Sequence, residues 1–294
     1  AKAAIVPEET EAIDIVGTGG DLANSFNIST TSAFVIAAAG AKVAKHGNRS
    51  VSSKSGAADV LEALGAKIGL TPEESKKCLD KVGAAFLFAQ THHGSMKYAG
   101  PVRAQLGVRS VFNILGPLAN PAMTNYIVLG VYEKELVRPM ADVMKNLGVK
   151  RALIVYGDDG LDEISISSTT SVCEINGDEI KEYTIDPEEL GLTLAKKEDI
   201  VGGTADENAI ITKDILTGKE QVMASFSSPF PYIFYNNKEQ GAKRDIVLLN
   251  AGAALYTIGK AETIKDGVKL AAEMIDSGKA NEKLEQFIAY TNVK

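Results

Sequence analysis

Short apolar runs alternate along this chain with longer segments of helical pattern, and most of the runs stop at a glycine or a polar turn. Because neighbouring parallel strands are joined through a helix, this alternation predicts an α/β fold with a mostly parallel central sheet flanked by helices. The expected strands are 12–16, 42–44, 84–89, 127–131 and 152–156. The expected helices are 29–39, 56–64, 72–82, 133–147, 206–216, 246–258, 261–276 and 281–290.

Three short patterns refine this prediction. The sequence TPEE at 71–74 is a capping box with proline at the first helical position, so we expect a helix to begin at Pro72. The run 84–89 is apolar throughout, which is typical of a central strand. The sequence NGD at 176–178 separates the runs 172–175 and 180–185 and predicts a β-hairpin.

Two stretches depart from the alternation. Residues 91–125 hold two histidines, a basic segment and the sequence GPLANP, so we expect helices with irregular joints there, inserted into an α/β domain made of 1–90 and 126–294. Within that insertion, we interpret 113–121 as turn and packing chemistry at a domain hinge. Residues 222–237 are rich in Phe and Tyr and carry no charge, which favours an irregular loop laid on an apolar surface over a lid.

Composition excludes several classes of protein. At 294 residues the chain suits two domains or one large α/β domain. A formal net charge of −7 argues against broad binding to nucleic acid but leaves room for a local basic pocket. No window approaches the roughly 18 apolar residues of a membrane span, and acidic residues stand where an export signal needs its apolar core. Two cysteines are too few for a disulfide framework, so we expect a cytoplasmic protein.

A glycine-rich loop after the first expected strand is the strongest chemical signal. Three glycines in four positions let backbone amides converge on phosphate oxygens. The loop consists of Gly17, Thr18, Gly19, Gly20 and Asp21. Asn27, Ser29 and Thr30 then begin a helix, where free amides favour an anion and where Ser29 or Thr30 can cap the helix. The alternative is a plain joint between strand and helix.

A second polar loop follows the second expected strand, at what should be the same edge of the sheet. It combines two fixed cations, a histidine, an amide and several hydroxyls. Its residues include Lys45, His46, Gly47, Asn48, Arg49 and Ser53. Open α/β sheets bind ligands beyond the carboxyl ends of their strands, so the two loops together predict one multiply charged anionic ligand. Arg49 could instead form a surface salt bridge, and His46 could simply be packed.

Adjacent carboxylates follow the strand that we expect at 152–156. Asp162 and Glu163 repel each other, and their pairing is easier to explain beside a divalent cation. A phosphate-bound Mg²⁺ fits, because it usually takes few carboxylates and keeps several waters. The alternative, favoured for these two residues alone, is an exposed acidic turn.

Several longer motifs carry a resemblance to a known family over almost the whole chain. They are DIVGTGGD, FNIST, KHGNRSVSSKSGAADVLEALG, VRSVFNILGPLANP, LDEIS and LLNAGAAL. Because these motifs occur in the family's order and spacing, the sequence resembles the anthranilate phosphoribosyltransferases of tryptophan biosynthesis. The resemblance implies a fold of the nucleoside phosphorylase and phosphoribosyltransferase type. It also implies transfer of the 5-phosphoribosyl group from phosphoribosyl diphosphate to the amine of anthranilate, with release of pyrophosphate.

The resemblance also implies roles for individual residues. Phosphoribosyl diphosphate would contact Gly17, Thr18, Gly19, Gly20, Asp21, Asn27, Ser29, Thr30, Lys45, His46, Gly47, Asn48 and Ser53. Mg²⁺ would be held by Ser29, Asp162 and Glu163. Anthranilate would contact Gly17, His46, Asn48, His93 and Arg103, with Arg103 holding its carboxylate. The sequence HHGS at 92–95 departs from the family's usual His-Pro-Ala, and we assign no general base.

The start of the chain adds a further expectation. The family is homodimeric and usually has several helices ahead of the glycine loop, whereas sixteen residues precede Gly17 here. We therefore expect a shortened chain in which 91–125 is the remnant of a small helical domain, with 222–237 as a candidate cover for its apolar surface. Two alternatives stay open beside an active transferase. One is an enzyme like the pyrimidine nucleoside phosphorylases, and the other is a non-catalytic binding paralogue.

Overall fold

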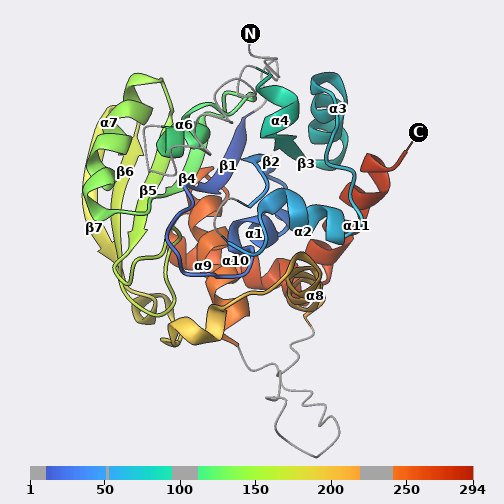
Figure 1. Ribbon diagram of the computed structural model, residues 1–294. Helices are drawn as coiled ribbons and strands as arrows, with labels where there is room; N and C mark the ends of the chain where they lie inside the picture. Colours follow the sequence, from blue (N-terminus) through green and yellow to red (C-terminus); the bar gives the residue numbers. More distant parts are fainter. Residues whose placement is uncertain (1–10, 51–52, 95–111, 219–240, 294) are drawn as a thin grey trace, which may run out of the picture.

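The computed structural model describes residues 11–50, 53–94, 112–218 and 241–293. Its centre is a seven-stranded sheet in the order β3-β2-β1-β4-β5-β6-β7 (Figure 1). The first five strands in chain order run parallel, and β6 and β7 are antiparallel. The predicted α/β fold is thereby confirmed. The strands are β1 (Ala12–Gly17), β2 (Lys42–Gly47), β3 (Ala84–Phe88), β4 (Tyr126–Gly130), β5 (Arg151–Gly157), β6 (Thr170–Asn176) and β7 (Glu179–Ile185).

Helices cover both faces of the sheet. The α-helices are α1 (Ile28–Ala38), α2 (Ala57–Ala63), α3 (Pro72–Val82), α4 (Ala89–His92), α6 (Phe112–Leu118), α7 (Val137–Asn146), α8 (Ala205–Leu216), α9 (Ala242–Thr257), α10 (Ile264–Asp276) and α11 (Lys279–Thr291). Short 3-10 helices are η1 (Lys134–Leu136), η2 (Glu188–Leu190) and η3 (Lys197–Ile200). Among the described residues, no helix is long and apolar enough to span a membrane.

The core lies in two layers, one on each side of the sheet. Successive strand residues point to opposite faces, so Ile127 and Leu129 of β4 pack with α7, whereas Val128 between them belongs to the larger cluster with α1 and α9. In Figure 1, α7 lies at the left over β5 and β6, away from α1, α9 and α10. Packing on both faces holds the strands in place, and the strands position the loops at the carboxyl edge of the sheet.

The direction of the strand connections reverses beside β1. From β1 the chain builds outward to β2 and β3, and it then returns to place β4 on the other side of β1. Gly17 of β1 pairs with Gly130 of β4 where the two strands end. Because the connections leave these two strands in opposite directions, their carboxyl ends form the position where open α/β sheets bind ligands.

Four details differ from the expectations. The run 84–89 does not form a central strand, because β3 lies at one edge of the sheet formed by the described residues, and packing of α3 and α4 buries it nonetheless. The second strand continues through Gly47, so Lys45 and His46 lie within β2. Neither Ser29 nor Thr30 caps α1, because Asn27 is the N-cap residue and makes no side-chain capping bond. The hairpin turn consists of Gly177 and Asp178, since Asn176 pairs with Glu179.

Other predictions of local structure are confirmed. Thr71 and Glu74 form the reciprocal capping bonds of α3, which begins at Pro72 as expected. Gly177 has φ +59°, as the first position of a two-residue hairpin turn can require. The segment 222–237 and residue Arg103 lie outside the described residues. The described part of 91–125 includes α6, a helix with Pro117 inside it.

Candidate active site at the carboxyl edge of the sheet

The glycine loop makes room for a carboxylate from another loop. A Cβ atom on Gly17 would lie 2.3 Å from Oδ2 of Asp162, and a Cβ on Gly130 would overlap the Asp162 backbone carbonyl. Both strands therefore end in glycine where the 157–163 loop crosses them. Gly19 and Gly20 have φ values of +71° and +85°, a backbone conformation that favours glycine.

An anionic oxygen already contacts an amide of this loop. Oδ2 of Asp162 accepts a 2.6 Å hydrogen bond from the backbone N–H of Gly19. In turn, the backbone N–H of Asp162 donates to Oδ2 of Asp21 at 3.4 Å. An amide held in this conformation can equally bind a phosphate oxygen, as expected from the glycine pattern.

A buried lysine lies among the carboxylates. Lys45 points from β2 towards α1, and its Nζ atom donates to the Ile15 carbonyl at 2.6 Å and to Oγ of Ser29 at 3.0 Å. Burial lowers the pKa of Lys45, and the carboxylates of Asp14, Glu163 and Asp162 oppose this shift. These acidic neighbours favour the charged form of Lys45, which burial disfavours.

Asp162 and Glu163 do not form an exposed acidic turn. Their exposed fractions are 9% and 8%. Burial raises the pKa of Glu163 to about 7, although Lys45 and hydrogen bonds from Ser29 act against the shift. Burial and the nearby Asp21 and Glu163 carboxylates raise the pKa of Asp162 well above its usual range. Burial is the largest cause of both shifts, and the neighbouring carboxylates add to it for Asp162; a bound cation would favour the ionised forms of both groups.

Asn250 of α9 holds this acidic loop in place. Its Oδ1 accepts from the backbone N–H of Ile164 at 3.0 Å, and its Nδ2 donates to the Ile164 carbonyl at 2.9 Å. The side chain is fully buried. The motif around Asn250 was quoted above without a role for this residue, and nothing local to the sequence indicates a contact over 86 positions.

The opposite face of β2 carries a pair of imidazoles. Nε2 of His46 lies 3.1 Å from Nε2 of His93, and the two rings meet edge to face with their centres 5.0 Å apart. Burial, followed by the neighbouring His93, lowers the pKa of His46 to about 3, so its imidazole is uncharged at neutral pH. Since successive residues of a strand point to opposite faces, the side chains of Lys45 and His46 lie on different faces of the sheet at the same edge.

Asn120 binds Asp14, a buried acid to which the sequence analysis gave no role. Its Nδ2 donates to Oδ2 of Asp14 at 2.7 Å and to the Ala44 carbonyl at 2.9 Å. Its Oδ1 accepts from the Ala122 backbone N–H at 2.8 Å. Asn120 thus has a packing role, in keeping with our interpretation of 113–121. An aspartate within an apolar strand was the available signal for Asp14.

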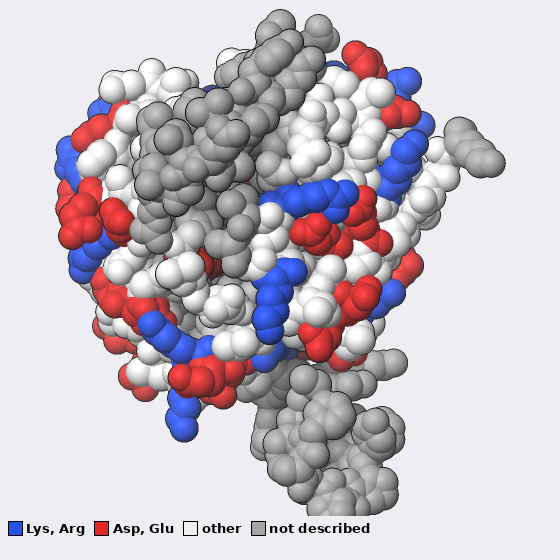
Figure 2. All heavy atoms as spheres, viewed as in Figure 1, with Lys and Arg blue, Asp and Glu red and all other residues white. Residues whose placement is uncertain are grey.

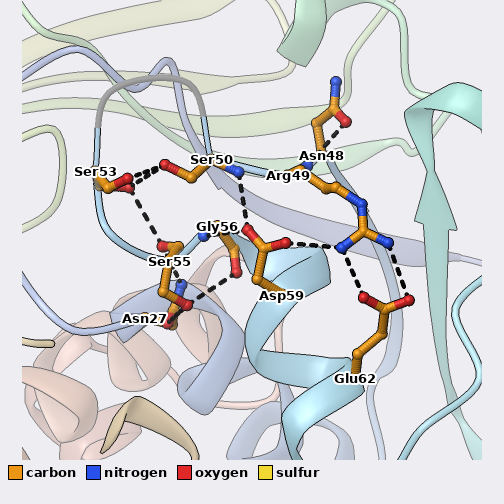
Figure 3. Close-up of polar contacts among 9 residues, drawn as sticks. All are labelled: Asn27, Asn48, Arg49, Ser50, Ser53, Ser55, Gly56, Asp59 and Glu62. Carbon is orange, nitrogen blue, oxygen red and sulfur yellow. Dashed lines mark hydrogen bonds and ion pairs between the residues drawn. The ribbon is translucent and has the colours of Figure 1, made fainter. Parts of the chain in front are cut away.

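The second polar loop connects β2 to α2, and its arginine is not free to bind a ligand (Figure 3). Arg49 donates to both carboxylate oxygens of Glu62, at 2.6 and 3.0 Å, and to Oδ1 of Asp59 at 2.8 Å. The salt-bridge alternative for Arg49 is therefore correct. Lys45 remains a buried cation directed at the site.

The amide of Asn27 links this loop to the start of α1. Its Nδ2 donates to the Ser55 carbonyl at 3.2 Å, and its Oδ1 accepts from Ser55 at 3.3 Å and from Nδ2 of Asn208 at 2.9 Å. Asn208 of α8, which sequence reasoning missed, is buried. These contacts orient Asn27 and bring Ser55 close to the residues that begin α1.

The donor set fits a magnesium ion that shares its coordination with a ligand. In the part of the chain that the structure describes, no group of three or more His, Cys, Asp or Glu side chains is placed to hold a metal. Asp162, Glu163 and the Ser29 hydroxyl instead offer a few oxygen atoms beside the glycine loop. Mg²⁺ prefers such sites, where waters and substrate phosphates complete its shell.

Electrostatics also limit the kind of ligand. On the face shown in Figure 2, Lys and Arg side chains are interspersed with Asp and Glu side chains, and the described residues present no broad area of one sign.

Comparisons with known proteins agree with this geometry. A family described as "Glycosyl transferase family, a/b domain" matches residues 9–281. The anthranilate phosphoribosyltransferase of Methanobrevibacter smithii is 54% identical over 284 residues, which cover 97% of this chain and 79% of the relative. That of Lachnoclostridium phytofermentans is 52% identical over 282 residues, covering 96% of this chain and 78% of the relative.

Solved structures give the same result. The crystal structure of anthranilate phosphoribosyltransferase from Thermus thermophilus matches with a TM-score of 0.88 at 40% identity, covering 99% of this chain and 81% of that one. The enzyme from Saccharomyces cerevisiae, in complex with PRPP (phosphoribosyl diphosphate) and Mg, matches with a TM-score of 0.84 at 31% identity, covering 96% and 74%. The relatives are thus transferases rather than nucleoside phosphorylases.

Proposed function

This chain belongs to the anthranilate phosphoribosyltransferase family, and from that premise we propose how its residues transfer the 5-phosphoribosyl group of phosphoribosyl diphosphate to the amine of anthranilate in tryptophan biosynthesis. The observation that carries the proposal is the convergence of Lys45, Ser29 and the Asp162–Glu163 pair on the glycine loop. This combination suits a substrate that brings both phosphate oxygens and a divalent cation.

The donor binds between the glycine loop and the loop that follows β2. A diphosphate oxygen can accept the hydrogen bond that the Gly19 N–H donates to Asp162 in this structure, and Lys45 supplies a nearby positive charge. Thr18, Gly20, Asp21, Asn27, Thr30, Gly47 and Ser53 complete the proposed donor contacts. Support comes from the Saccharomyces cerevisiae relative, whose solved structure contains PRPP and Mg.

Ser29, Asp162 and Glu163 are the residues that would hold Mg²⁺. When bound, the ion neutralises negative charge on the pyrophosphate leaving group. The protein contributes two buried carboxyl groups, whose pKa values are raised chiefly by burial. A bound cation favours their ionised forms, because opposite charge lowers the pKa of a carboxyl group.

Anthranilate binds on the side of the imidazoles. His46, His93 and Asn48 are the described residues that we assign to it, and Gly17 lies between the two substrates. A neutral His46 places no positive charge near C1 of the ribose, where positive charge develops as pyrophosphate leaves. The aniline nitrogen is a weak nucleophile, so correct positioning contributes more than a strong base. We assign no proton acceptor.

Some assignments are not tested by the described residues or by the comparisons. Arg103 as the holder of the anthranilate carboxylate, the role of 222–237 and the division into an α/β domain with an inserted helical part at 91–125 stay predictions. A cytoplasmic location is likewise a proposal, supported by the reaction's phosphorylated donor.

A fluorescence assay tests the proposed function. The protein is mixed with anthranilate, Mg²⁺ and phosphoribosyl diphosphate, and the loss of anthranilate fluorescence is followed. We expect a loss that requires both the donor and Mg²⁺. A parallel assay with a pyrimidine nucleoside and inorganic phosphate should release no base. Base release without anthranilate consumption would contradict the transferase and support a phosphorylase.

A further inference from the structure

We propose that Asp59 is a positioning residue that holds the donor-binding loop after β2 in its binding conformation. This inference rests on the proposed function. We call residues 48–50 and 53–56 the donor loop, which is its described part. Asp59 touches neither substrate in our assignment and would act through the backbone of this loop.

A single carboxylate oxygen joins the two ends of the donor loop (Figure 3). Asp59 is the third residue of α2, and its Oδ2 accepts from the backbone N–H of Ser50 at 3.0 Å and of Gly56 at 2.9 Å. An N3 carboxylate that binds the N-cap amide is an ordinary helix cap. The additional bond to Ser50 is not part of such a cap, and it closes the loop.

The closure leaves no room for a side chain. A Cβ atom on Gly56 would lie 2.3 Å from the backbone nitrogen of Ser50 and 2.9 Å from the Asn48 carbonyl. The same Asn48 carbonyl accepts from the N–H of Ala58 at 3.2 Å. The strand end that carries Asn48 is therefore tied directly to the start of α2.

Arg49 holds the same carboxylate from the other side. It donates to Oδ1 of Asp59 while its fork binds Glu62, and its guanidinium lies 5.7 Å from the centre of the Phe88 ring. A bidentate arginine fixes orientation as well as distance. Asp59 is thus restrained through Oδ1, and it restrains the loop through Oδ2.

The consequence for substrate is geometric. Asn48, assigned to both substrates, lies on one limb of the loop, and Ser53, assigned to the donor, lies on the other. Ser55 on the second limb is bonded to Asn27 beside the proposed Mg²⁺ ligand Ser29. The contacts of Asp59 therefore set the spacing between donor contacts that come from separate parts of the chain.

The test compares Asp59→Asn with Glu74→Gln. Glu74 is the N3 residue of the capping box on α3, and it has no contact with the donor loop, so it is a matched control for loss of a helix cap. We expect Asp59→Asn to raise the Kd and the KM for phosphoribosyl diphosphate about 10-fold or more, because small misplacements of binding groups are costly. The kcat at saturating concentrations of both substrates should change much less.

Calorimetric titration with phosphoribosyl diphosphate and Mg²⁺ measures the Kd, and thermal denaturation measures the cost of each lost cap. A weaker donor affinity in Asp59→Asn but not in Glu74→Gln, with both variants folded at the temperature of the titration, would support the proposal. A donor Kd that is unchanged in Asp59→Asn, or raised equally in Glu74→Gln, would overturn it. Glu62→Gln, which leaves both Asp59–backbone bonds intact, should have a smaller effect than Asp59→Asn.

The same experiments separate this proposal from the proposed function. If the unmodified protein binds the donor but does not consume anthranilate, the proposed function is wrong, and the Kd comparison still decides the role of Asp59. If the unmodified protein does not bind the donor with Mg²⁺, both proposals are overturned.

Discussion

The carboxylate of Asp162 accepts a 2.6 Å hydrogen bond from the backbone N–H of Gly19, 143 positions away in the sequence. This contact places a protein carboxylate on an amide that we assign to the diphosphate of the donor. The glycine loop thus binds an anionic oxygen in the structure itself. We propose that the donor's phosphate oxygens compete with Asp162 for this amide when the donor binds, which would leave Asp162 available to Mg²⁺.

Replacing Asp162 tests this relationship. Asp162→Asn keeps an oxygen that can accept from Gly19 but removes the negative charge. We expect kcat/KM to fall about 100-fold, and the Mg²⁺ concentration for half-maximal rate to rise, because a ligand that would hold the ion is weakened. The measurement is the initial rate of anthranilate loss over a range of Mg²⁺ concentrations. Asp158→Asn, in an exposed residue of the same region bonded to Lys134, is the control and should retain the normal Mg²⁺ requirement.

Removing the anchor of the acidic loop should lower the free energy of unfolding. Asn250→Ala leaves the N–H and the carbonyl of Ile164 buried without their partners, at a cost of about 3 kcal/mol in the free energy of unfolding. Urea denaturation measures this cost. Asn292→Ala, which removes two bonds from an exposed amide to carbonyls, should cost less than about 1 kcal/mol. Equal costs for the two variants would show that Asn250 does not anchor the loop.

Lys45 is expected to contribute stability that depends on pH. Lys45→Met removes the ammonium group from beside Asp14, Asp162 and Glu163, which should lower the free energy of unfolding by about 3–5 kcal/mol at pH 8. Lys45 holds down the pKa of Glu163, which is about 7 in the unmodified protein. Removing Lys45 therefore raises this pKa further, and the folded variant takes up more protons than the folded unmodified protein as pH falls from 8. The deficit should therefore be smaller at pH 5.5 than at pH 8.

Denaturation of the protein and of Lys45→Met at both pH values checks this prediction. Millimolar Mg²⁺ at pH 8 should recover part of the loss, because the cation would neutralise the same carboxylates. Lys42→Met is the control from the same strand. Its side chain pairs with Asp80 at the surface, so its cost should be about 1 kcal/mol or less at either pH. A deficit for Lys45→Met that grows as pH falls would contradict the expected charge balance.

Local patterns in the sequence were sufficient for much of the fold. The capping box at Thr71 and Glu74 needs only four consecutive residues, and the structure shows both of its bonds. The turn after the first strand was predictable for the same reason: its signal is a run of glycines, and Gly19 and Gly20 do have the positive φ values that glycine permits. Elements whose signal lies within one turn or one strand are therefore predictable from a single sequence.

What the sequence did not reveal depends on contacts between distant segments. An apolar run such as 84–89 reads the same whether neighbouring strands or helices bury it, so β3 was placed in the centre rather than at the edge. Gly17 was assigned to phosphate binding, but the group that leaves no room for its side chain is Asp162. Asn250 and Asn208 act on residues 86 and 181 positions away, and nothing near either asparagine indicates its partner.

Buried His46 should make the protein less stable in acid. Its folded-state pKa of about 3 lies below the ordinary 6.5, so between these pH values the unfolded chain binds more protons than the folded one. The stability contributed by a neutral His46 is present above about pH 6.5 and is lost as pH falls towards 3, amounting to about 2 kcal/mol at pH 4.5. His46→Gln has no such group, and its amide can still donate to the Gly116 carbonyl that His46 binds. The free energy of unfolding should therefore fall less between pH 7 and pH 4.5 in the variant than in the unmodified protein, as urea denaturation at the two pH values would measure.

Asp14, whose pKa is raised to about 6, titrates in both proteins and cancels in the comparison. Equal losses in the two proteins would mean that the folded state does not lower the pKa of His46, which would contradict this prediction.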